Sequence, residues 1–327
     1  MTIVSSSIFA QEPAFTQFFT MPLYLNPAFA GATEQYRFNT SYRSQWNSLP
    51  TPLETNVATF DYHLPNYNVG LGAILSSDRI TNLGVSSNSF SVLYSYSTYT
   101  DNWIYRFGLQ AGIISRSISY AKLVFGDQLL SGSLVSKEKL PQETIFMPDF
   151  SIGFTGYQQD IWYGFAIHHL NRPQQTVIQS SYNDDERLPA RFSVHAGGRY
   201  RIKDRAGERV YILPSLLFQY QNISTLLDFS TALRYNDFSI GLTYKGSLSK
   251  PSSSLSANRQ AIALFTGLRY RGFRFGYSFE YGLKGNNAYS IGNSHEISLV
   301  FAPKAKYKFK KKIKDNTRVY IPIYGFY

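Results

Sequence analysis

Few residues of this chain have the types and spacing that catalysis or metal binding requires. His168 and His169 could suggest a metal pair, but adjacent side chains on a strand point to opposite faces, so one ion cannot readily take both. Asp184, Asp185 and Glu186 lack the spaced oxygen ligands of a Ca²⁺ loop and are predicted to form a solvated acidic loop. The chain has no cysteine, no nucleophile elbow and no phosphate-binding glycine loop. We therefore expect no enzyme activity, no cofactor and no bound metal.

The composition indicates which elements must position the remaining polar residues. Charged residues make up 16% of the 327 residues and aromatic residues 17%, while the mean hydropathy is only -0.22. No window approaches the roughly 20 consecutive apolar residues of a transmembrane helix. Few charges, many aromatics and no long apolar run are typical of strands that alternate apolar and polar residues, as in a transmembrane β-barrel.

The net charge of +11 is concentrated near one end of the chain. The stretch 304–318 holds eight basic residues and one acidic residue, which leaves the body nearly balanced. No nucleic-acid-binding module accompanies it, so we expect no nucleic-acid partner. The basic tail at 303–327, with Lys310, Lys311 and Lys312, is either a solvated extension or a docking segment for a partner.

Residues alternate with a period of two from Tyr36 onward, which is the period of a β-strand. In 238–245 every even position is large and apolar, and every odd position is Ser, Gly, Thr or Lys. About fourteen such segments are predicted, at 36–46, 53–62, 67–77, 85–97, 103–120, 148–158, 161–170, 189–200, 210–220, 224–235, 238–246, 260–270, 273–281 and 294–302.

The connections between these segments alternate in length, and many of the aromatic residues lie near the predicted strand ends. Those predicted to face the periplasm are 63–66, 98–102, 159–160, 201–209, 236–237 and 271–272, and most are short. Those predicted to face outward are 47–52, 78–84, 121–147, 171–188, 221–223, 247–259 and 282–293, and most are long. Outer-membrane barrels sort their loops in this way, whereas a soluble β-sandwich has no reason to do so. We predict an all-β fold: a single transmembrane outer-membrane β-barrel of about 14 antiparallel strands over 36–302.

Several polar residues fall on the predicted inner face of this barrel. They are Arg37, Asn39, Arg43, Gln45, Arg106, Asp228, Arg234, Arg274, Glu280 and Glu296. They could line a water-filled pore, or they could pair into arginine–carboxylate networks that close the lumen. Both signs of charge occur, so we favour the filled lumen.

The first 35 residues do not alternate. Residues 1–10 end on small Ala10 and resemble the remnant of a signal peptide, so the exported chain is expected to begin near Gln11. Residues 11–35 carry three prolines and are predicted to be extended. This segment could tuck into the inner mouth of the barrel or dock a partner. The candidate partner-binding residues are Phe15, Phe18, Pro22, Tyr24, Asn26, Pro27 and Phe29, together with the three tail lysines.

The segment also carries a specific resemblance. Residues 15–18 (FTQF) followed by 22–31 (PLYLNPAFAG) resemble the N-terminal signature of the PorP/SprF family of type IX secretion system outer-membrane proteins. Further matching motifs follow in the family's order: Tyr42–Trp46, Phe60–Asp61, Gly70–Gly72, Pro148–Phe150 with Gly153, Gly276–Glu280 and His295–Ile297. The basic tail after Phe301 departs from the pattern, which leaves the identity of a periplasmic partner open.

The resemblance implies a non-enzymatic barrel in the cell outer membrane that serves type IX secretion and gliding. Its expected partners are outer-membrane lipids, periplasmic or lipoprotein components of that machinery, and a secreted adhesin or its C-terminal sorting domain. The segment 12–31, the turn 201–209 and the tail would contact the periplasmic partners, and loops 121–147 and 171–188 would hold surface cargo or partner barrels. The alternatives are a diffusion channel of the long-chain fatty-acid transporter type and a soluble β-sandwich adhesin.

Overall fold

The computed structural model describes the chain in thirteen stretches. These are residues 15–33, 36–47, 52–64, 66–80, 84–100, 102–119, 132, 144–175, 187–205, 207–222, 224–247, 260–283 and 292–303. The predicted signal-peptide remnant, the basic tail with Lys310, Lys311 and Lys312, the acidic triplet 184–186 and most of loops 121–147 and 171–188 lie outside them.

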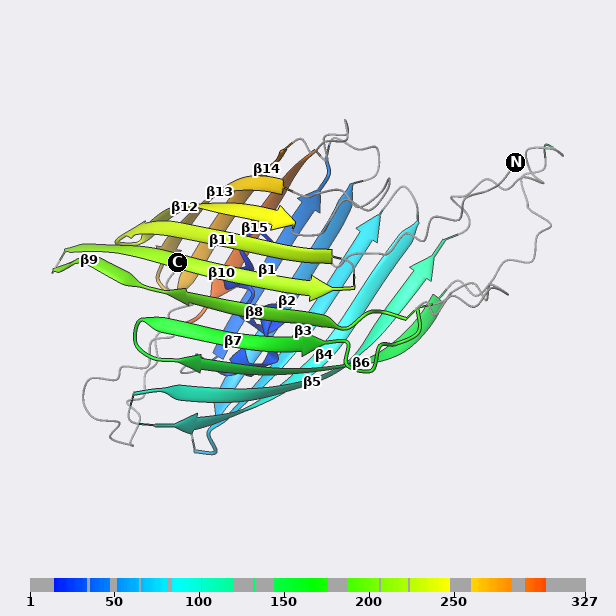
Figure 1. The fold of residues 1–327 in the computed structure, drawn as a ribbon, viewed down its shortest axis with the longest axis horizontal. Helices are drawn as coiled ribbons and strands as arrows, with labels where there is room; N and C mark the ends of the chain where they lie inside the picture. The colour runs from blue at the N-terminus through cyan, green and yellow to red at the C-terminus, as the bar shows by residue number, and fades with distance from the viewer. Residues whose placement is uncertain are drawn as a thin grey trace.

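The described residues form one antiparallel sheet of fifteen strands (Figure 1). The strands are β1 (Tyr36–Gln45), β2 (Leu53–Leu64), β3 (Val69–Ile80), β4 (Val85–Tyr99), β5 (Ile104–Ile118), β6 (Thr144–Tyr157), β7 (Ile161–His168), β8 (Arg191–Gly198), β9 (Tyr200–Arg205), β10 (Glu208–Gln221), β11 (Ser224–Tyr235), β12 (Phe238–Ser247), β13 (Gln260–Tyr270), β14 (Phe273–Leu283) and β15 (Asn293–Phe301). Because β1 pairs with β15 and β10 pairs with β11, fourteen strands close into a barrel and β9 stays outside the ring. The predicted fold class is confirmed.

The two faces of the wall follow from the alternation in the sequence. Along β12, Leu242 is 52% exposed on the outer face, whereas Thr243 beside it is fully buried in the lumen. The other strands of the ring repeat this arrangement, with aromatic and aliphatic side chains outside and Ser, Thr, Arg or Gly inside. An apolar outer surface is what lipid requires, so the barrel is inverted relative to a soluble protein.

The connections are sorted by length between the two ends of the barrel. At one end the strands are joined by 65–68, 100–103, 158–160, 206–207, 236–237 and 271–272, each of at most four residues. At the other end the connections are 46–52, 81–84, 119–143, 169–190, 222–223, 248–259 and 284–292. Of these seven, only 81–84 and 222–223 are as short. Outer-membrane barrels sort their connections in the same way, with the short turns on the periplasmic side.

One predicted connection is wrong. Residues 201–209 were expected to form a turn, but they build β9 and the start of β10, and only 206–207 connects the two strands. The pairing shifts register between Val210 and Tyr211, which marks a β-bulge. The bulge interrupts the alternation that would have identified this hairpin in the sequence.

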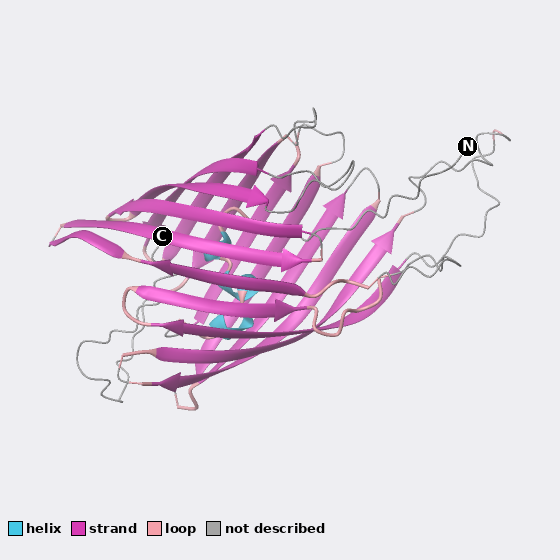
Figure 2. Cartoon of the chain, in the orientation of Figure 1, coloured by secondary structure: helices cyan, strands magenta, loops and turns pink. Residues whose placement is uncertain are grey.

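The N-terminal segment lies inside the barrel (Figure 2), and we call its described residues Phe15–Thr33 the plug. It contains three short helices, η1 (Phe18–Thr20), α1 (Pro22–Leu25) and η2 (Pro27–Phe29), so the expectation of an extended segment is wrong. Pro22 and Pro27 begin helices because the fixed φ of proline suits the first helical position. No helix among the described residues is long and apolar enough to cross a membrane.

The hydrophobic core lies between the plug and the inner wall. Phe19 and Phe29 of the plug pack against Phe265 and Trp162, with ring centroids 5.1 and 6.2 Å apart. A second cluster joins Phe15, Met21, Leu23 and Ala30 to Val57, Ile74 and Leu93. In a soluble β-sandwich the apolar core lies between two sheets. Here the plug takes the place of the second sheet and packs its apolar residues against the wall.

Candidate functional site in the barrel lumen

A buried charge cluster lies on the inner wall where the first and last strands meet. Arg43 on β1 lies 2.8 Å from Glu280 on β14 and 3.1 Å from Glu296 on β15. Lys245 on β12 approaches Glu280 at 3.3 Å. Arg43 and Glu296 are almost fully buried, so their charges need partners with good geometry. We call these four residues the Arg43 cluster.

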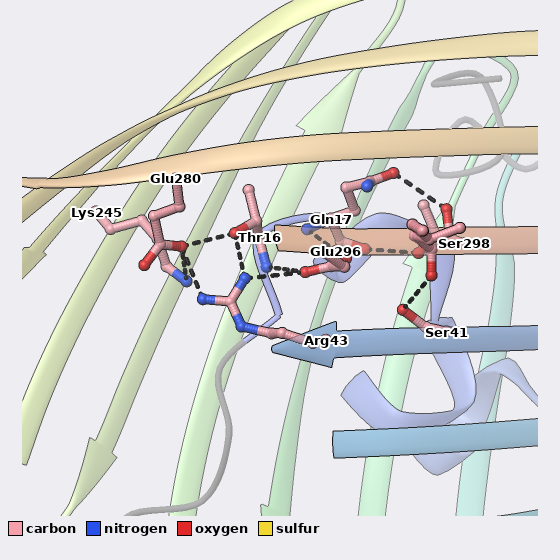
Figure 3. A network of polar contacts seen from close by, with 10 residues as sticks. Thr16, Gln17, Ser41, Arg43, Lys245, Glu280, Glu296 and Ser298 are labelled. Atoms are coloured by element: carbon pink, nitrogen blue, oxygen red, sulfur yellow. Dashed lines mark hydrogen bonds and ion pairs between the residues drawn. The ribbon is translucent and has the colours of Figure 1, made fainter. Parts of the chain in front are cut away.

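The plug completes the Arg43 cluster (Figure 3). The backbone N–H groups of Thr16 and Gln17 donate to Glu296 at 2.8 and 3.2 Å. The Thr16 hydroxyl donates to Glu280 at 2.7 Å and accepts from Arg43 at 2.6 Å. Each carboxylate is therefore bound both by a wall cation and by the plug, which ties the start of the plug to strands from both ends of the barrel sequence.

A second ion pair holds the end of the plug. Arg37 on β1 donates from Nε to Asp61 on β2 at 2.7 Å, and both side chains are fully buried. The second oxygen of Asp61 accepts the backbone N–H of Gly31 at 2.8 Å. The carboxylate thus links the wall to the point where the plug turns toward β1.

Arg106 on β5 binds backbone carbonyls in the middle of the plug. Its Nε donates to Ala28 O at 3.0 Å, and its Nη2 donates to Ala30 O and to the Ser95 hydroxyl, the latter at 2.6 Å. Ser95 itself donates to Ala30 O at 2.7 Å. A buried arginine here satisfies carbonyl groups that the short helices leave open.

Asn26 joins two helices of the plug to the opposite wall. Its side-chain oxygen accepts from the backbone N–H of Ala28 at 2.9 Å and so caps η2. Its amide nitrogen donates to Phe154 O at 2.9 Å and Phe165 O at 3.0 Å, and lies 3.0 Å from His195 Nε2. Asn26 is fully buried, so this amide has little access to water.

Glycines on the wall make room for the plug backbone. A Cβ added to Gly108 would lie 2.5 Å from Ala28 Cα, and one added to Gly70 would overlap Ala30 O. No real side chain tolerates such contacts, so the wall is shaped around this one path of the plug. These two glycines of the inner face are therefore required for the close packing of the plug against the wall.

The predicted partner-binding residues of the N-terminal segment all belong to the plug. Phe15, Phe18, Pro22, Tyr24, Asn26, Pro27 and Phe29 lie in the lumen, and all except half-buried Tyr24 are buried. Tyr24 lies under the guanidinium of Arg191, 5.5 Å from its ring centroid. Their side chains contact the barrel in this arrangement, and their role in binding a partner stays a prediction.

The predicted lumen residues divide into two groups. Arg37, Arg43, Arg106, Glu280 and Glu296 take part in the networks that hold the plug, and Asn39 also donates to Thr20 O at 3.0 Å. Asp228 is buried opposite Lys245, Arg234 lies over the Tyr211 ring at 4.4 Å, and Arg274 is half-buried opposite Arg269. The partners described for this second group lie on the wall.

Sequence reasoning missed several members of these networks. Asp61 and Lys245 occupy inner positions in alternating strands, so their parity could have identified them. Thr16 and Ser95 carry no such signal, because an uncharged hydroxyl inside a barrel is ordinary. Which carboxylate meets which cation depends on strand register and closure, and a single sequence does not contain that information.

The prediction that His168 and His169 point to opposite faces is wrong. Strand β7 ends at His168, and His169 has a positive φ of 59°, which turns its ring back into the wall. Both are buried: His168 lies 3.3 Å from Leu25 O, and His169 binds Asp149 at 2.8 Å. Among the described residues no three His, Asp or Glu side chains gather as a metal site would require.

Comparisons with known proteins give a family and a set of similar barrels. Residues 7–301 match the family described as type IX secretion system membrane protein PorP/SprF. No curated protein has a significant match to the sequence.

Several solved structures resemble the fold at low identity. They include the CymD monoaromatic hydrocarbon channel (12% identity, covering 88% of this chain and 94% of that chain, TM-score 0.49), the Pseudomonas putida toluene transporter TodX (10%, 85% and 91%, 0.47) and the Acinetobacter baumannii outer membrane protein Omp33 (9%, 83% and 99%, 0.46). At this level of similarity they carry no information on what this chain binds or transports.

Proposed function

Because the chain belongs to the PorP/SprF family of type IX secretion system membrane proteins, we propose that it works by binding, without enzymatic activity. It is a β-barrel of the cell outer membrane and a component of type IX secretion. In the proposed role it anchors periplasmic components of the secretion and gliding machinery, holds secreted cargo at the cell surface, or does both.

The observation that carries this proposal is the plug. Hydrogen bonds from Thr16, Asn26 and Gly31 connect it to the wall along its length, and two of these three anchors involve fully buried carboxylates. A lumen filled and bound in this way favours a rigid scaffold whose two rims are the working surfaces. A binding component needs such rigidity, because partners must meet a fixed surface on each side of the membrane.

The two rims suit different partners. The short-turn end lies in the periplasm and presents the β9–β10 hairpin, with the basic tail following β15 in the sequence. The long connections 119–143 and 169–190 lie at the outer end, where a secreted adhesin or its C-terminal sorting domain would be held.

The alternative of a diffusion channel of the long-chain fatty-acid transporter type is not favoured. A channel needs a continuous wet path, whereas Phe18, Phe19, Leu25 and Phe29 of the plug pack directly against the wall. Conduction would require this apolar contact and the buried ion pairs to separate together.

Co-purification tests the proposed role. The protein is precipitated with a specific antibody from gently solubilised membranes, and an unrelated outer-membrane barrel of the same cells serves as the control. We expect periplasmic or lipoprotein components of type IX secretion, or a secreted adhesin, to be enriched. Recovery of the barrel alone would argue for a channel.

A second precipitation addresses the basic tail. A variant lacking 303–327 is compared with the full chain at equal surface expression. Loss of the periplasmic partners would assign their docking to the tail, and unchanged recovery would exclude it.

A further inference from the structure

The β9–β10 hairpin leaves one strand edge of the barrel unpaired. Among the described residues β9 pairs only with β10. On its other side β7 begins at Ile161, level with Gly198, so β9 runs past the β6–β7 turn for about five residues, or about 17 Å of strand. Figure 1 shows the hairpin projecting beyond the neighbouring turns. The backbone edge of β9 that extends past the start of β7 is long enough to pair with another strand. We call this unpaired edge the open step.

The contacts of β10 show which backbone groups of β9 point away from β10, toward the unpaired edge. Arg209 donates its N–H to Asn236 Oδ1 at 2.9 Å, and its C=O accepts from Asn236 N at 2.8 Å. Both backbone groups of Arg209 thus point away from β9. Asp204 is the cross-strand partner of Arg209, and in an antiparallel ladder both members of such a pair point away from each other. The N–H and C=O of Asp204 therefore face the open step.

The hairpin is also strongly basic. Residues 199–209 include five basic and two acidic residues. The local ion pairs are Arg199–Asp160, Arg201–Asp160 and Lys203–Glu208. Neither Arg205 nor Arg209 has an ion-pair partner among the described side chains. Charge of one sign on an edge repels a second copy of the same edge and admits a strand of opposite charge.

We propose that β9 is a docking edge for an extended, acidic segment of a periplasmic protein, which adds to the sheet as a strand. The periplasmic location of this edge rests on the proposed function. Strand addition combines main-chain hydrogen bonds with side-chain selection. The outward N–H and C=O of Asp204 would provide the hydrogen bonds, and the basic side chains would select an acidic segment. An anionic lipid headgroup would use the charges but leave the backbone groups without partners.

The proposal is tested on the purified full chain in detergent, with a short fluorescein-labelled peptide of alternating glutamate and valine as the probe. Fluorescence anisotropy reports binding, and the same peptide with lysine in place of glutamate is the control. We expect the acidic peptide to bind and the basic one not to bind. Failure of the acidic peptide to bind overturns strand addition, and it leaves the co-purification result untouched.

Two variants separate the contribution of the backbone hydrogen bond to peptide binding from the contribution of charge. Asp204→Pro removes the outward N–H and leaves the β9–β10 ladder intact, because proline is tolerated on strand edges. We expect it to weaken binding by about fivefold, the effect of losing one hydrogen bond. Asp204→Asn keeps the N–H and should bind at least as tightly as the original chain. Heat-modifiable gel migration confirms that each barrel is folded.

The double variant Arg205→Glu with Arg209→Glu provides the second measurement and does not depend on a proline. We expect it to lose binding of the acidic peptide. If it does so while Asp204→Pro binds normally, recognition is by charge alone, as for an anionic headgroup, and strand addition is overturned. If it binds as well as the original chain, the charge argument is overturned.

Discussion

At the scale of single residues, the lumen is organised by buried charges whose partners come from distant parts of the chain. Arg43 contacts carboxylates on the last two strands, and the plug contacts those same carboxylates through Thr16. Burial makes an isolated charge costly, whereas a fully bonded set is stable and geometrically specific. The Arg43 cluster therefore couples barrel closure to placement of the plug.

The first prediction concerns Arg43. Arg43→Met should lower the free energy of unfolding by about 3–5 kcal/mol, because it leaves the Glu296 carboxylate buried without its cation. Arg79→Met is the matched control, since Arg79 is exposed on β3. Guanidinium unfolding of both variants in lipid vesicles gives the comparison, and equal stabilities would contradict the role of the cluster.

At the scale of elements, the plug and the wall are shaped for one another. The wall lacks side chains at Gly70 and Gly108, where the plug backbone approaches, and it supplies Arg106 where the plug presents carbonyls. The three helices of the plug have only three or four residues each, too few to be stable alone. Its conformation is therefore set by contacts with the wall.

The second prediction concerns this fit. In Gly108→Ala the added Cβ overlaps the backbone of Ala28, so we expect the plug to shift. The free energy of unfolding should fall by about 1–3 kcal/mol. Hydrogen exchange of the plug peptide should increase while the barrel strands stay protected. The control is Gly198→Ala, whose Cβ approaches only Asp160 O, at 3.2 Å. Similar exchange in both variants would show that the plug is not held by this contact.

Much of the wall could be predicted from the sequence, because alternation is a local property. Strands such as β12 and β14 were predicted to within two residues of their ends from the pattern of large and small residues. The β9 strand was missed because a bulge breaks the period, and the helices of the plug were missed because their prolines also occur in extended chains. The pairing of Arg43 with Glu280 and Glu296 depends on closure between the first and last strands, which no local pattern encodes.

At the scale of the whole molecule, the protein has two apolar interfaces in place of one core. The outer face contacts lipid, and the inner face packs against the plug. The alternation of apolar outer side chains with mainly polar inner ones explains how a chain with so many aromatic residues has a mean hydropathy close to neutral. It also makes the effect of a charge depend on which face it occupies and at what depth.

The third prediction uses that dependence. Leu242 lies near the middle of β12 on the lipid face, so Leu242→Arg should cost about 2–4 kcal/mol, whereas Tyr235→Arg at the interface should cost about 0–1 kcal/mol. Unfolding in lipid vesicles measures both. Equal costs would place Leu242 away from the centre of the bilayer.

The proposed binding role requires that the plug closes the lumen of this outer-membrane barrel. A planar-bilayer recording of the purified full chain tests it most directly, with a porin as the positive control for insertion. We expect no large, steady conductance, because the plug occupies the lumen and hydrogen bonds to the buried ion pairs hold it there. A large, steady conductance from the full chain would show that the lumen is open and would favour a diffusion channel.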